Sequence, residues 1–133
     1  MFRVSCIQLK SNDNIYQNLE STKKKIVLAI KQKTDFIITP EVSSLFSLNK
    51  NFLLKICNPM KKDIYLNGIK KLAKKYKIWI LVGSAIIKIS KNKLVNRSVL
   101  IDKNGRIKSY YDKIHMYDVI LSKKEKYQES KIF

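Results

Sequence analysis

Two charged residues stand where side chains could act on a bound molecule. Glu41 follows an apolar run that ends at Pro40, and Lys113 follows the run from Arg106 to Tyr111. Ligands of α/β proteins gather at the carboxyl ends of strands, so a carboxylate there has a functional position. Lys113 has apolar and aromatic neighbours, so we expect it to be less solvated than the surface lysines. Taken singly, Glu41 also fits a turn acid, and Lys113 fits a lysine whose stem covers apolar surface.

The single histidine and the two cysteines are weaker candidates for chemistry. His115 has no identifiable serine or cysteine partner, so we interpret it as a hydrogen-bonded structural residue rather than a general base. Cys6 and Cys57 show neither CxxC nor Cys/His spacing, which argues against a zinc site or a disulfide framework. Cys6 lies in an apolar run, and we interpret it as a small buried hydrophobic residue.

The elements that must position Glu41 follow from the hydrophobic pattern of the first forty residues. Residues 2–10 form a short apolar run typical of a buried strand, and Ile15–Lys33 carries its apolar residues on one helical face. A second short strand is predicted at Asp35–Thr39. This strand–helix–strand order predicts parallel neighbours joined by a helical crossover. Residues 41–60 have no regular pattern beyond a short apolar piece near Phe52.

The elements that must position Lys113 form a helix, a central strand and a hairpin. Asp63 can cap a helix that runs to Tyr76. The uninterrupted apolar run Ile78–Val82 predicts a central strand covered on both faces. The remaining predicted features are a break at Gly83-Ser84, a continuation over Ala85–Ile89, strands at Leu94–Ile101 and Arg106–Tyr111, and a turn at Asp102–Gly105 whose Asn-Gly pair tolerates positive φ. The polar tail Leu121–Phe133 ends as if a strand began there, which suggests an incomplete domain.

The composition is typical of a folded protein with a packed core and a polar surface. Of the 133 residues 45% are hydrophobic, which suffices for a core, and no apolar run approaches the roughly 20 residues that span a membrane. The formal charge of +18 comes mostly from lysine, since arginine occurs only at Arg3, Arg97 and Arg106. Proteins that bind nucleic acid rely on arginine side chains, which form paired hydrogen bonds, and on aromatic side chains that stack on bases. We therefore interpret the lysines as residues on the solvated faces of helices. We expect a cytoplasmic protein without nucleic-acid or membrane partners.

Several short motifs occur together in one order along nearly the whole chain. They are Ile7-Gln8-Leu9, Ile38–Glu41, Ile80–Ser84, Asn96–Asp102, Gly105, Tyr111–Val119 and Tyr127–Ser130. The Pro-Glu pair alone is weak, whereas YDKIH followed by the Glu-Ser pair is specific. With these motifs the chain resembles the nitrilase superfamily of carbon–nitrogen hydrolases, in the amidase branch similar to omega-amidase and deaminated-glutathione amidase.

The resemblance implies a role for three residues. Glu41 matches the general base, Lys113 matches the lysine that stabilises the oxyanion, and Glu129 matches the glutamate that positions the lysine and the substrate. The nucleophilic cysteine of the family comes later than Phe133, and neither Cys6 nor Cys57 matches it. A thiol of pKa near 8.5 needs such a base at neutral pH. This route requires no metal and no organic cofactor.

The resemblance also implies an architecture. We expect an α/β fold, a partial nitrilase-type αββα sandwich in which residues 1–133 form the amino-terminal part, about half, of a single domain truncated before its nucleophile. The full-length protein would hydrolyse a small omega-amide and form a homo-oligomer, and the chain alone would be inactive. The alternatives are a degenerate, non-catalytic binding module or pseudoenzyme, and a basic nucleic-acid-binding protein.

Overall fold

The computed structural model describes residues 1–120, 122 and 126–133. Its helical elements are α1 (Ile15–Lys31), α2 (Lys50–Ile56), α3 (Ile64–Tyr76), and the short 3₁₀ turns Met60–Lys62 and Glu129–Lys131. Its strands are β1 (Val4–Cys6), β2 (Phe36–Ile38), β3 (Trp79–Ser90), β4 (Lys93–Ile101), β5 (Ile107–Asp112), β6 (Asp118–Ile120) and β7 (Lys126–Gln128). Part of the predicted tail, residues 121 and 123–125, lies outside the described residues.

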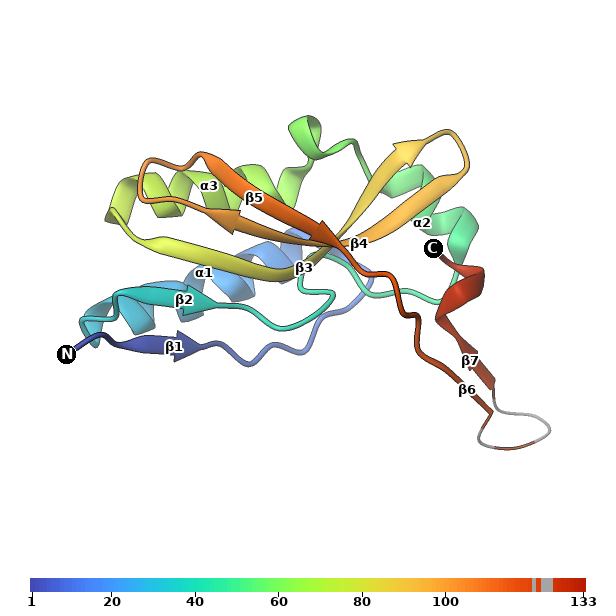
Figure 1. Ribbon diagram of the computed structural model, residues 1–133, viewed down its shortest axis with the longest axis horizontal. Coiled ribbons are helices and arrows are strands. Elements are labelled where there is room, and N and C mark those ends of the chain that lie inside the picture. Colours follow the sequence, from blue (N-terminus) through green and yellow to red (C-terminus); the bar gives the residue numbers. More distant parts are fainter. Residues whose placement is uncertain (121, 123–125) are drawn as a thin grey trace.

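Five strands form one mixed sheet in the order β1-β2-β3-β4-β5 (Figure 1). The pairs β1/β2 and β2/β3 are parallel, whereas β3/β4 and β4/β5 are antiparallel. The register aligns Ile37 with Ile80 and Ile80 with Ile101, so these side chains share one face. The predicted parallel crossover and the predicted hairpin are therefore both confirmed.

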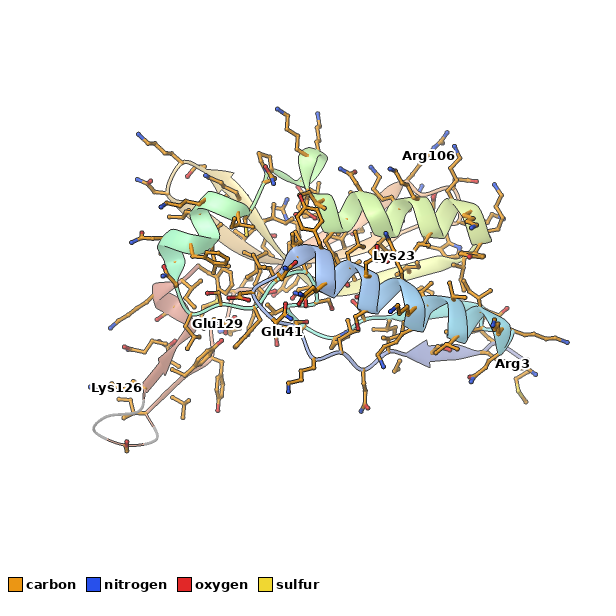
Figure 2. The ribbon with its side chains drawn as sticks, turned by 180° about the vertical axis from the view of Figure 1, so that it is seen from behind. Arg3, Lys23, Glu41, Arg106, Lys126 and Glu129 are labelled. Atoms are coloured by element: carbon orange, nitrogen blue, oxygen red, sulfur yellow. The ribbon has the colours of Figure 1, made fainter. Side chains whose placement is uncertain are left out.

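Helices α1 and α3 pack side by side on one face of the sheet (Figures 1 and 2). Ile26 of α1 and Ile69 of α3 are fully buried against Ile80 and its neighbours. Full burial of such a side chain contributes roughly 1.5–3 kcal/mol. On the opposite face Trp79 and Leu81 are only half-buried. The prediction that Ile78–Val82 is covered on both faces is therefore wrong for this chain, because both long helices lie on the same side.

The two long helices begin at caps that hold their first N–H groups. The side chain of Asn14 accepts from the backbone N–H groups of Tyr16 and Gln17, and the Asp63 carboxylate accepts from Leu66 N. Helix α1 ends at Lys31, two residues before the predicted end, because Lys33 adopts a left-handed conformation with φ of 58°.

The structure corrects the predictions for four other segments. Residues 50–56 form α2, capped by Asn49, within a stretch expected to be irregular. Strand β3 continues through Gly83 and Ser84 with a register shift instead of a break. Cys6 is exposed on the short edge strand β1, so it is not a buried hydrophobic residue. Lys131 ends a 3₁₀ turn and residues 132–133 follow it, so the last residues do not begin a strand.

Strands β6 and β7 form a separate hairpin that projects from the main sheet (Figure 1). Its return leads into the 3₁₀ turn that begins at Glu129, and this turn lies beside α2, where Lys50 Nζ donates to Lys131 O. Among the described residues no helix is both long enough and apolar enough to cross a membrane.

Candidate active site

Glu41 lies in a tight turn that crosses the bulge of β3. Thr39 N donates to Leu81 O, and Ser84 accepts from the next residues: Val42 N lies 2.7 Å from Ser84 Oγ, and Ser43 N lies 2.8 Å from Ser84 O. A Cβ at Gly83 would come within 1.9 Å of Thr39 O, so only glycine allows this close crossing. The turn is thereby held against the central strand by backbone contacts and by the Ser84 hydroxyl.

The turn also contains strained backbone. Val42 has a φ of 52°, a left-handed conformation that a β-branched residue rarely adopts. Such strain costs on the order of 1–3 kcal/mol and persists only where surrounding contacts enforce it. Here the hydrogen bonds to Ser84 on both sides of Val42 supply that enforcement. The Glu41 side chain consequently starts from a fixed backbone position.

Lys113 directly follows β5 and is tied to the neighbouring strand, because its N–H donates to Asn96 O at 2.9 Å. One residue earlier, the Asp112 carboxylate accepts two bonds from the Arg97 guanidinium, at 2.6 and 2.7 Å. That guanidinium lies 4.2 Å from the ring centre of Tyr110. The paired carboxylate raises the pKa of Arg97. This bidentate pair secures the end of β5, where the lysine leaves the sheet.

Glu129 is a buried carboxylate with both oxygens occupied. Its Oε2 accepts from Lys113 Nζ at 2.7 Å and from Tyr117 N at 2.7 Å. Its Oε1 accepts from Asn96 Nδ2 at 3.2 Å. The side chain is only 3% exposed, and a carboxylate so deeply buried needs such partners to remain charged.

Lys113 joins the two glutamates. Its ammonium lies 2.9 Å from Glu41 Oε1 as well as 2.7 Å from Glu129 Oε2. Figure 2 labels both glutamates, which lie near each other although 88 positions separate them in the chain. The three side chains line one pocket of about 280 Å³, together with Val42, Phe46, Tyr117 and Tyr127.

The electrostatics of this cluster favour the charged forms of Lys113 and Glu129. Burial opposes the charge of Lys113, but its hydrogen bonds to Glu129 and Glu41 outweigh burial and raise the pKa of the lysine. Burial likewise opposes the charge of Glu129. The bonds from Lys113, from Tyr117 N and from Asn96 more than offset it, so the pKa of Glu129 is lowered. An ammonium therefore stays in the pocket at neutral pH.

The two carboxylates differ in how freely they can act. Glu129 is saturated with donors, whereas the Glu41 side chain is 53% exposed. Within the described part of the chain, donors reach Glu41 only at Oε1. Its Oε2 can face a bound molecule and exchange a proton with it. The arrangement thus combines a fixed cation, a fixed anion and an accessible carboxylate.

A family comparison supplies the context for this cluster. Residues 3–133 match the carbon–nitrogen hydrolase family, which is almost the entire chain. The chain belongs to the carbon–nitrogen hydrolase family. The resemblance seen in the sequence motifs is thereby confirmed.

Curated relatives of this carbon–nitrogen hydrolase chain include two amidases. A deaminated glutathione amidase from Yersinia enterocolitica is 30% identical over 122 residues, which cover 87% of this chain and 41% of the relative. The omega-amidase NIT3 from Saccharomyces cerevisiae is 27% identical over 135 residues, which cover 96% of this chain and 46% of the relative. The chain thus spans less than half the length of these relatives.

A solved structure shares the fold of this carbon–nitrogen hydrolase chain. The Caenorhabditis elegans NitFhit protein superposes with a TM-score of 0.83 at 25% identity, covering 99% of this chain and 33% of that one. The α/β fold with helices on one face of a sheet therefore corresponds to part of a nitrilase-type domain.

The residues predicted from sequence differ in where the structure places them. Glu41, Lys113 and Glu129 meet in one pocket, as the geometry above shows. His115 is exposed and makes no hydrogen bond to any described residue, so its interpretation as a hydrogen-bonded structural residue is wrong. Neither cysteine lines the pocket. Among the described residues no group of three or more His, Cys, Asp or Glu side chains is placed to hold a metal ion.

One polar residue of the cluster, Asn96, was not singled out as a site residue. It lies within the block Asn96–Asp102 that carried part of the family resemblance. The available signal was an amide that, together with Arg97 and Ser98, interrupts the apolar residues of the strand Leu94–Ile101. A buried amide requires hydrogen-bonding partners, and here those partners are the two glutamates.

Proposed function

We propose that this chain supplies the base and the cation for amidase-type hydrolysis of a non-peptide C–N bond, with a small omega-amide as the substrate class. The observation that carries the proposal is the Lys113 ammonium, held 2.9 Å from Glu41 and 2.7 Å from Glu129 in a shared pocket. The names of the two curated amidase relatives support the substrate class.

The chemistry assigns a separate task to each group. Glu41 takes the proton of a cysteine thiol, and the thiolate adds to the amide carbonyl carbon. The carbonyl oxygen becomes an oxyanion, which the Lys113 ammonium stabilises. As the C–N bond breaks, Glu41 returns its proton to the departing nitrogen, which leaves as ammonia or an amine. A water molecule, deprotonated by Glu41, then attacks the thioester and releases the acid and the thiol.

The thiol in this scheme must come from outside these 133 residues. Cys6 lies on the exposed edge strand, and Cys57 is buried where burial raises the pKa of its thiol to about 12. We therefore infer that residues 1–133 form the amino-terminal part of a single domain. The half-covered sheet face beside Trp79 and the 41% coverage of the Yersinia relative support this inference. The isolated chain is accordingly expected to be inactive.

A non-catalytic module is the second candidate, favoured by the lack of a cysteine in the pocket lining. Such a module would bind a small amide at Lys113 without cleaving it. The two candidates differ in one observable. An amidase forms a covalent acyl-enzyme, whereas a binding module shows saturable amide binding with no mass increase.

The test uses the complete gene product that carries this chain, with ammonia release from small omega-amides and intact mass as readouts. We expect Glu41→Gln and Lys113→Ala each to lower turnover by about 100-fold or more. Lys108→Ala is the matched control, because Lys108 is an exposed lysine of β5 outside the pocket. Turnover near the unchanged level in either pocket variant would refute the assigned roles. Amide binding without any ammonia release would favour the module.

A further inference from the structure

Asn96 links the two glutamates in the same way as Lys113 does, but without carrying charge. Its Nδ2 lies 2.7 Å from Glu41 Oε1 and 3.2 Å from Glu129 Oε1. The amide NH₂ has two N–H groups, one for each carboxylate. Both partners are carboxylate oxygens, which only accept, so the nitrogen and not the oxygen of the amide must face them. Glu41, Lys113, Glu129 and Asn96 therefore form a closed ring of hydrogen bonds.

The position of Asn96 in the sheet makes it the fixed member of this ring. It pairs with Ile86 in the β3/β4 register, and its carbonyl accepts from Lys113 N. Its exposed fraction is 1%, whereas the Glu41 side chain is 53% exposed. A half-exposed glutamate samples several rotamers unless something holds it, and a strand residue packed on both sides can do so.

The neutrality of Asn96 matters for the charge of the pocket. Two carboxylates share one ammonium, which leaves the ring with a net charge of −1. A second cation at position 96 would neutralise this charge and lower the basicity of the carboxylates. An apolar residue would leave Glu129 Oε1 without a donor. An amide supplies two donors and adds no charge.

We propose that Asn96 is a positioning residue that orients Glu41 for proton transfer. By occupying Glu41 Oε1 together with Lys113, it leaves Oε2 as the oxygen that faces the pocket. Its second N–H fixes Glu129, so the base, the cation and the anion keep one geometry. This inference rests on the proposed amidase function, because it assigns Glu41 a proton to accept.

The first test measures kinetics of the complete gene product. Asn96→Ala removes both donors, and the loss of a hydrogen bond to a charged group corresponds to about a 10- to 100-fold loss of kcat/KM. We expect this loss mainly in kcat, and we expect the acid limb of the pH–rate profile to move to higher pH. Asn67→Ala is the matched control, since Asn67 lies on α3, where its amide donates to Lys61 O. An unchanged pH profile and kcat for Asn96→Ala would overturn the proposal.

The second test separates positioning from folding and from the proposed activity. Asn96→Asp keeps the shape of the side chain but replaces its donors with a third carboxylate. We expect ¹³C NMR titration of the glutamate carboxyl groups to show a higher pKa for Glu129 in both Asn96 variants. An unshifted Glu129 titration in a folded variant would refute the link, even if no amide were hydrolysed. If the pKa of Glu129 shifts in the Asn96 variants but the unchanged protein hydrolyses no amide, only the amidase proposal is refuted.

Discussion

At the scale of single residues, the two glutamates of the pocket divide their tasks according to how many donors each accepts. Glu129 accepts from Lys113, Tyr117 N and Asn96, whereas Glu41 is half-exposed. A carboxylate saturated with donors is a poor base, because protonation would break its hydrogen bonds. The saturated residue therefore suits a structural role, and the half-free residue suits proton transfer.

This division predicts a stability effect for Glu129. Glu129→Gln places an amide N–H group against the N–H groups of Asn96, and we expect the free energy of unfolding to fall by about 2–3 kcal/mol. Glu20→Gln is the matched control on α1, where the exposed pair with Lys23 contributes at most about 0.5 kcal/mol. Urea unfolding at pH 7 measures both. Equal stability of the two variants would show that Glu129 is not held by the ring.

The difference in the free energy of unfolding between the unchanged protein and Glu129→Gln depends on pH, and the pKa of Glu129 sets the sign of this dependence. The pKa of Glu129 is lower in the folded protein than in the unfolded chain, so the folded state binds fewer protons. The stabilising contribution is present above the unfolded pKa and is lost as the pH falls through the folded pKa. We therefore expect the gap between the unchanged protein and Glu129→Gln to narrow in acid. A gap that widened in acid would contradict the assignment.

At the scale of elements, the crossing of β3 by the Glu41 turn requires Gly83. We expect Gly83→Ala to lower the free energy of unfolding by more than 3 kcal/mol, because its Cβ would meet the backbone of Thr39 at 1.9 Å and backbone cannot move aside. Gly68→Ala is the matched control on α3. There the Cβ meets only the side chain of Leu19, whose methyl groups lie at 2.7 Å and whose Cγ lies at 3.2 Å, and the helix gains up to about 1 kcal/mol of propensity. Thermal unfolding of both variants checks the difference.

The N-terminal cap of α3, Asp63, predicts a change of stability with pH. Asp63 Oδ2 is buried without a hydrogen-bond partner among the described residues, and burial raises the pKa of Asp63 from 3.8 to about 6. The folded state then binds more protons between pH 4 and 6, so this group makes stability fall as the pH rises through that range, by roughly 3 kcal/mol. We expect Asp63→Asn to remove this fall while keeping the cap. An unchanged slope in urea unfolding from pH 4 to 6 would contradict the buried charge.

The elements also show how far the sequence alone leads. The family motifs singled out Glu41, Lys113 and Glu129, which the structure brings to one pocket. Periodicity predicted α1 and α3, and the strand–helix–strand order predicted the parallel pairing of β1 with β2. Periodicity did not find α2, because seven residues form too few turns for a pattern. The role of Asn96 and the exposure of Cys6 depend on tertiary contacts across strands, which no local pattern encodes.

At the scale of the whole molecule, the sheet has two unlike faces. Ile80 points to the helices and is fully buried, whereas its neighbour Leu81 points to the other face and is half-buried. In register with Leu81, Ile38 and Leu100 lie on the same open face. An apolar sheet face without a covering layer associates with other apolar surfaces in water. The 133-residue chain expressed alone is therefore expected to self-associate.

A pair of adjacent substitutions in β3 tests this asymmetry. Leu81→Arg places a charge on the open face, and we expect it to reduce self-association at a cost of about 1 kcal/mol or less in stability, because the guanidinium can reach water. Ile80→Arg places the same charge in the helix-covered core, where an unpaired buried cation prevents folding. Sedimentation velocity reports association, and circular dichroism reports folding. If the unchanged chain were monomeric at high concentration, or if both variants folded equally well, the open face would not be an apolar surface that drives association.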